Sequence, residues 1–214
     1  DPETAATLSL LRERIDHEAC YGDWEAGTHR RPWATWGIAA VLVAIFVLEM
    51  TGGSGPASLS WDYATRLIER SLDPDHLIDL GALIVPQSYT PGEWWRVLTA
   101  GFLHFGPLHL GLNLLGLLVL APRLERAWGP LPMVFCYLTA TATSMALAPH
   151  VMRLTEGPPM RILVGASGGM MGLLGGLVGF QLVGWLQHRT ERTRRPLLFL
   201  LVIIALQTAF DLST

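Results

Sequence analysis

The residues best suited to chemistry in this sequence are one serine and a histidine–asparagine pair, all set in apolar segments. Ser167 lies in the glycine-rich stretch "VGASGGMMGLLGG", and His109 and Asn113 lie in "PLHLGLNLLG". Because residues four apart share one face of a helix, His109 and Asn113 are expected to project together. A serine hydroxyl becomes a nucleophile once a base takes its proton, and imidazole and amide N–H groups can stabilise an oxyanion. The three side chains together therefore predict acyl transfer, of which peptide hydrolysis is the commonest form.

The composition predicts that these side chains are positioned by membrane-spanning helices. Half of the 214 residues are hydrophobic and 15% are charged, and the mean hydropathy is positive. This balance is typical of a polytopic membrane protein rather than of a soluble domain. The formal net charge of −3 argues against a nucleic-acid partner. The fold class expected is an all-α, polytopic transmembrane helical bundle.

Five apolar runs are long enough to cross a bilayer or nearly so, and basic residues follow a regular pattern around them. Arginines precede the first run, follow the second and follow the fourth, so the positive-inside rule places the N-terminus in the cytoplasm and the C-terminus outside. The predicted spans are residues 34–50, a helix from Pro107 to near Pro122, residues 131–148, residues 162–186 and residues 196–210.

The same helix boundaries predict a common depth for the three polar side chains. If the fourth span begins near Ile162, Ser167 lies on the order of 7–8 Å below the outer surface, at ~1.5 Å per residue. Counted from Pro107, His109 and Asn113 lie roughly 3 and 9 Å deep. Polar groups at membrane depth are costly and usually mark function. The three groups are therefore expected to meet just below the outer surface.

Two structural alternatives stand beside this functional interpretation. The glycines at four-residue spacing, such as Gly168, Gly172 and Gly176, are also typical of helices that pack closely, and serine is common at such interfaces. His109 and Asn113 could equally form a polar clasp between two helices. No metal site is expected, because His104 and His109 are five apart and have no acidic third ligand nearby. No cofactor is expected either.

Three separated motifs resemble the rhomboid family of intramembrane serine proteases, over roughly residues 34–214. "GEWWRVLTAGFLHFGPLHLGLN" resembles the family's Trp-Arg loop and His-x-x-x-Asn motif, "LERAWG" resembles the cytoplasmic end of its second helix, and "GASGG" resembles its Gly-x-Ser-Gly motif. The resemblance implies that Ser167 is the nucleophile of a serine–histidine dyad. It also implies an oxyanion hole formed by the Ser167 amide, His109 and Asn113, while His104 is structural and braces the outer loop.

The resemblance also implies a sixth helix that packs on the glycine face of the fourth and carries the general-base histidine. The sequence begins at Asp1 and ends at "FDLST", which resembles the approach to that helix. We therefore expect a trimmed chain whose catalytic histidine follows Thr214. Many family members carry an aromatic residue where this chain has Met171, so the histidine is expected to be held more loosely.

The expected organisation is a cytoplasmic segment at residues 1–33, with one short amphipathic helix, and a rhomboid-like transmembrane domain at residues 34–214. The expected function is intramembrane serine endopeptidase, acting on single-span or polytopic membrane proteins in the lipid bilayer. The expected location is the bacterial inner membrane. The alternative is a rhomboid-like pseudoprotease that binds transmembrane helices without cleaving them. A soluble hydrolase is rejected because its elbow needs a preceding strand and an acid and a histidine well downstream, whereas only 47 residues follow Ser167 and most of them are apolar or cytoplasmic. A transporter is disfavoured because internal repeats are not visible.

Overall fold

The structure is a computed structural model. It describes residues 31–51, 68–69, 71–85, 92–155, 161–188, 194–195 and 197–202. Almost all of the predicted cytoplasmic segment, with its short helix, lies outside the described residues. Most of the predicted fifth span lies outside them too, although residues 197–202 are helical.

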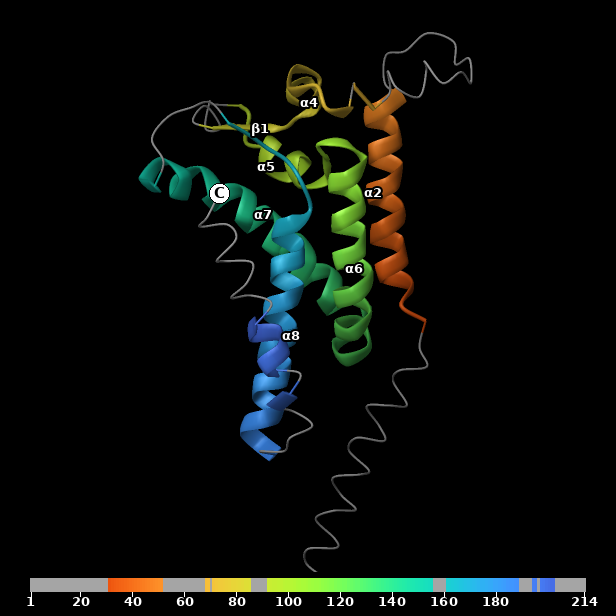
Figure 1. Cartoon of the computed structure of the whole chain (residues 1–214), viewed down its shortest axis with the longest axis vertical. Coiled ribbons are helices and arrows are strands. Elements are labelled where there is room, and N and C mark those ends of the chain that lie inside the picture. The colour runs from red at the N-terminus through yellow and green to blue at the C-terminus, as the bar shows by residue number, and fades with distance from the viewer. Residues whose placement is uncertain are drawn as a thin grey trace, which may run out of the picture.

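Four long helices form the body of the described chain, and each is long and apolar enough to cross a membrane. Three of them, α2, α6 and α8, run roughly alongside one another, and α7 crosses obliquely behind (Figure 1). The expectation of a helical membrane bundle is thereby confirmed. Their bounds are α2 Trp33–Thr51, α6 Gly106–Trp128, α7 Pro130–Thr155 and α8 Ser167–His188.

A small layer of short elements covers one end of the bundle (Figure 1). It is named the outer layer here because it lies outside the long helices. It includes a two-stranded antiparallel sheet, in which Leu83 pairs with Leu163 and Val85 with Arg161. The expectation of an all-α chain is wrong in this respect. The elements are α4 Pro74–Leu80, β1 Leu83–Val85, α5 Arg96–Thr99, the 3₁₀ helix η1 Ala100–Phe102 and β2 Arg161–Leu163.

The fourth apolar run does not begin as a helix, which corrects the predicted start near Ile162. Residues 161–163 are extended, and helix α8 begins at Ser167. The break has a local cause, because Gly165 has a φ of 119°, a conformation that a right-handed helix cannot contain. Ser167 is therefore the first residue of its helix rather than a residue one turn or more inside it.

Two other helix ends differ from the predictions. Helix α6 passes through Pro122 and ends at Trp128, and the following Gly129 has a φ of 88°. Helix α7 likewise contains Pro149 and continues to Thr155, past the predicted end of this span at residue 148, so His150 lies on a helix. A proline inside a helix removes one backbone hydrogen bond, and in these two long apolar helices that loss does not end the helix.

The α2–α6 contact is fixed by a buried carboxylate at the end of the bundle opposite the outer layer. Glu125 on α6 accepts hydrogen bonds from the Ala34 and Thr35 amides, both at 2.9 Å, and from the Thr35 hydroxyl at 2.7 Å. These are two of the first amides of α2, which have no partner within their own helix. Glu125 therefore joins the start of α2 to the end of α6.

Candidate active site

The segment that leads into α8 passes directly against α6. The Gly165 amide donates to the Ala100 carbonyl at 2.9 Å, which holds the segment to η1. A Cβ atom at residue 165 would lie 2.7 Å from His109 Cε1, 2.8 Å from His109 Nε2 and 3.8 Å from Asn113 Nδ2. Glycine is therefore required at this position both by its φ and by the close approach of the imidazole.

Ser167 follows two residues later, as the first residue of α8, and it is exposed. The first amides of a helix lack intrahelical acceptors and lie at the positive end of its dipole. In the predicted mid-helix position, the Ser167 amide would have been bonded to the preceding turn. The observed start leaves the amides of the first turn available to an anion.

His109 and Asn113 come to the Gly165 segment from successive turns of α6. The Phe105 amide donates to His109 Nδ1 at 3.3 Å, and Asn113 Nδ2 donates to the His109 carbonyl at 3.1 Å. An Nδ1 atom that accepts a hydrogen bond carries no proton, so the neutral ring has its proton on Nε2. The Nε2–H and one remaining N–H of the Asn113 amide are thus donors on the side of α6 that meets Gly165.

His104 lies next to His109 and is fully buried. Its ring contacts the His109 ring edge to face, with the centroids 5.4 Å apart. Burial and, secondarily, the neighbouring His109 lower the pKa of His104 to about 4. His104 is therefore neutral at physiological pH.

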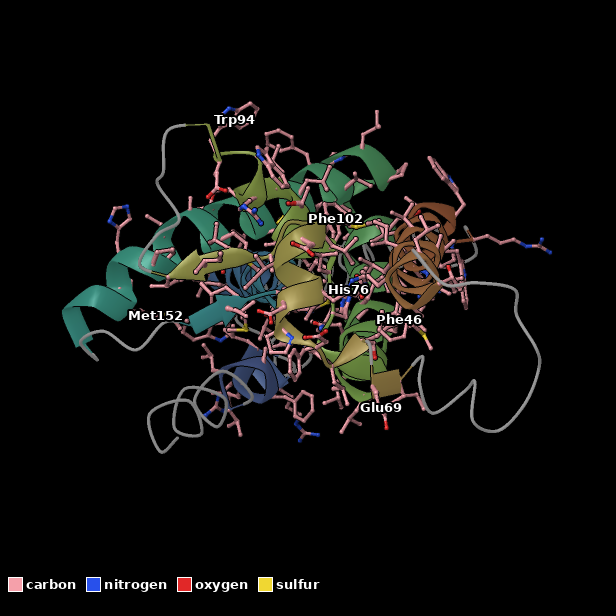
Figure 2. All side chains as sticks on the ribbon, turned by 90° about the horizontal axis from the view of Figure 1, so that it is seen from above. Phe46, Glu69, His76, Trp94, Phe102 and Met152 are labelled. Atoms are coloured by element: carbon pink, nitrogen blue, oxygen red, sulfur yellow. The ribbon has the colours of Figure 1, made fainter. Side chains whose placement is uncertain are left out.

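The Trp-Arg pair braces the outer layer. The Arg96 guanidinium donates to the Ile78 carbonyl at 2.6 Å and to the Ala82 carbonyl at 3.1 Å, and it lies 4.7 Å from the Trp95 ring centroid. Seen from above, Trp94 lies at the edge of this layer and His76 lies near its centre (Figure 2). This bracing fixes the loop that leads into η1 and α6.

Most of the glycines of α8 contact α7 and α6. A Cβ at Gly168 would meet Ser144, one at Gly169 would meet Tyr137 and Thr141, and one at Gly172 would meet Ala140, all on α7. The close-packing alternative is thus correct for these positions. Gly175 and Gly179 have nothing among the described residues within 4 Å of where a Cβ would be, so they leave room for the expected sixth helix.

The structure therefore brings His109, Asn113 and the segment before Ser167 together. Two contributors were not singled out from the sequence. Gly165 entered only as the first glycine of the Gly-x-Ser-Gly motif, and its close contact with His109 was not expected. The role of the Phe105 amide could not be found, because a backbone donor leaves no mark on the sequence.

Comparisons with known proteins agree with these motifs. A family model described as Rhomboid domain matches residues 91–213. RHOMBOID-like protein 5 of Arabidopsis thaliana is 28% identical over 84% of this chain and 61% of that protein. Rhomboid-like protease 3 of Toxoplasma gondii is 31% identical over 60% of this chain and 47% of that protein. Rhomboid protease GluP of Bacillus subtilis is 30% identical over 66% of this chain and 23% of that protein.

The chain spans between 46% and 66% of the length of four Arabidopsis relatives that it matches. The matched region contains α5, α6, α7 and α8, and so includes the histidine–asparagine pair and the serine. Because the family model covers more than half of the chain, this integral membrane protein belongs to the rhomboid family.

Proposed function

We propose that the protein is an intramembrane serine endopeptidase with Ser167 as its nucleophile. The observation that carries this proposal is the position of Ser167 at the first turn of α8, two residues after a glycine that lies against His109 and Asn113. Family membership supports it, because some of the relatives are named as proteases. The same site also explains why a polar pair on α6 is retained within an apolar span.

In the proposed reaction, Ser167 Oγ attacks the scissile carbonyl carbon while a base takes its proton. The developing oxyanion accepts hydrogen bonds from the Ser167 amide, His109 Nε2–H and the remaining Asn113 Nδ2–H. The base then donates its proton to the leaving amine, and water hydrolyses the acyl-enzyme. Following the rhomboid resemblance, we propose that the base is a histidine of a sixth helix beyond residue 214.

The substrates proposed are single-span or polytopic membrane proteins, cleaved in or near a transmembrane segment. An intact helix engages its carbonyls in internal hydrogen bonds, so segments that unwind easily are the preferred substrates. The proposed orientation has the N-terminus in the cytoplasm of a bacterial cell, with the site below the outer face of its inner membrane. The end of the bundle that carries Arg31, Arg123 and Arg126 would then face the cytoplasm.

We also propose that the transmembrane domain begins at residue 34, upstream of the residues matched by the family model. Helix α2 packs on α6, and Glu125 binds its first amides. A helix held in this way is part of the bundle that positions α6.

A pseudoprotease is the competing function, and a fluorophosphonate probe separates the two. The full-length protein in detergent is expected to be labelled, with the adduct on Ser167 and no labelling of the Ser167→Ala variant. Labelling needs an activated serine but no substrate, so it does not depend on finding the natural one. A folded full-length protein that stays unlabelled would favour the pseudoprotease.

A further inference from the structure

A buried carboxylate lies in the last turn of α2, where the helix approaches the outer layer. Glu49 is 1% exposed, whereas the preceding Leu48 is 66% exposed. Placing a carboxyl group within an apolar span is costly, and such groups usually mark function. Glu49 is absent from the serine–histidine–asparagine site described above.

Glu49 is connected to the outer layer through both its side chain and its backbone. Its Oε2 accepts the His104 amide at 3.4 Å, and its carbonyl accepts from His76 Nε2 at 2.9 Å. Its Oε1 is buried and has no hydrogen-bond partner in the described structure. The Oε2 contact is therefore the one that connects this carboxylate to the loop before α6.

Residues 104–106 form a short turn whose successive amides have different acceptors. The His104 amide donates to Glu49, the Phe105 amide to His109 Nδ1 at 3.3 Å, and the Gly106 amide to the His104 carbonyl at 3.0 Å. Only the φ and ψ angles of His104 separate these two peptide planes, and sterics limit those angles, so fixing the first amide limits the directions open to the second. Glu49 on α2 and His109 on α6 therefore bind the same two-residue stretch of backbone.

We propose that Glu49 is a positioning residue for His109. By holding the His104 amide, it keeps the Phe105 amide on His109 Nδ1, and this keeps the ring proton on Nε2, which faces Gly165. A histidine whose outer hydrogen bond is lost can adopt the other tautomer and would then present a lone pair where the reaction needs a donor. The inference rests on the proposed function in one respect, namely that His109 Nε2–H stabilises the oxyanion.

Two substitutions of Glu49 in the full-length protein test this role. Glu49→Gln keeps a side-chain oxygen that can accept the His104 amide, whereas Glu49→Leu has similar volume and no acceptor. With ¹⁵N-histidine labelling in detergent, the wild type and Glu49→Gln are expected to show His109 as the Nε2–H tautomer. Glu49→Leu is expected to show a mixture of tautomers, with kcat lowered about ten-fold and KM little changed.

The lipid-facing neighbour provides the control, because Leu48→Ala should leave both the tautomer and kcat unchanged. A pure Nε2–H tautomer with normal kcat in Glu49→Leu would overturn the proposal, as would an equal loss in Glu49→Gln and Glu49→Leu. If Glu49→Leu does not fold, Glu49→Asp replaces it, because the shorter side chain withdraws the acceptor and should give the same tautomer mixture. The tautomer is read without any substrate, so it separates a failure of this inference from a failure of the proposed protease activity.

Discussion

Gly165 illustrates how a single residue sets the geometry of the site. Its φ of 119° turns the chain from strand β2 into helix α8, and its missing side chain lets the His109 ring approach. Alanine would require both a strained backbone and a displaced imidazole. Removal of one oxyanion donor costs about 10²–10³ in kcat, so Gly165→Ala is expected to lower kcat by about 100-fold or more.

Gly92 is a matched control for this substitution. It also has a positive φ, of 99°, but nothing among the described residues lies within 4 Å of where its Cβ would be. Gly92→Ala should therefore show the conformational strain alone, of about 1–3 kcal/mol, with kcat nearly unchanged. Equal kcat values for the two variants, measured on one model substrate, would show that the contact with His109 does not matter for catalysis.

The buried imidazole of His104 should make the stability of the folded protein depend on pH. Its pKa is about 4 in the folded protein, against an ordinary value of 6.5. The unfolded chain therefore binds more protons between these two values, so stability is full above pH 6.5 and is lost as the pH falls towards 4. The loss due to this group is at most about 3 kcal/mol.

Thermal unfolding in detergent at pH 7 and pH 4.5 measures this dependence. His104→Gln is expected to be less sensitive to acid than the wild type, because the buried imidazole is gone. His150→Gln serves as the control, because it replaces an exposed histidine instead of a buried one. Equal acid sensitivity of His104→Gln and the wild type would contradict the assignment.

Among the helices, the contact between α7 and α8 depends on the glycines of α8. A Cβ at Gly172 would collide with Ala140 on the facing helix, whereas a Cβ at Gly111 on α6 would meet nothing within 4 Å in the part of the chain that the structure describes. Overpacking costs about 1–3 kcal/mol, while alanine in place of an uncrowded helical glycine gains about 1 kcal/mol. We therefore expect Gly172→Ala to lower the unfolding temperature in detergent and Gly111→Ala to raise it. A higher unfolding temperature for Gly172→Ala would show that the two helices are less closely packed than described.

At the scale of the whole molecule, hydropathy and charge were sufficient to predict much of the fold. They located the four described spans, and residue chemistry singled out Ser167, His109 and Asn113. Hydropathy could not distinguish strand β2 from the start of a helix, because apolar residues such as Ile162 and Leu163 suit both. It could not show that Glu49 meets His104, since that contact joins residues 55 positions apart. Contacts of this kind depend on how the helices pack, which local sequence does not encode.

The packing of the helices explains why this bundle can hold a hydrolytic site. The Glu125 contacts join α2 and α6 at one end, and the Gly165–His109 contact joins α6 and α8 at the other. The candidate site thus lies at the end covered by the outer layer, away from the arginines of α6. This separation predicts cleavage of a substrate near only one face of the membrane.

The most direct measurement of whether Ser167 attacks a peptide bond is cleavage of a single-span model substrate by the full-length protein in liposomes. Wild type is expected to give one product pair, cut near the outer end of the substrate helix, and Ser167→Ala is expected to give none while remaining folded. Undiminished cleavage by folded Ser167→Ala would contradict this role of Ser167.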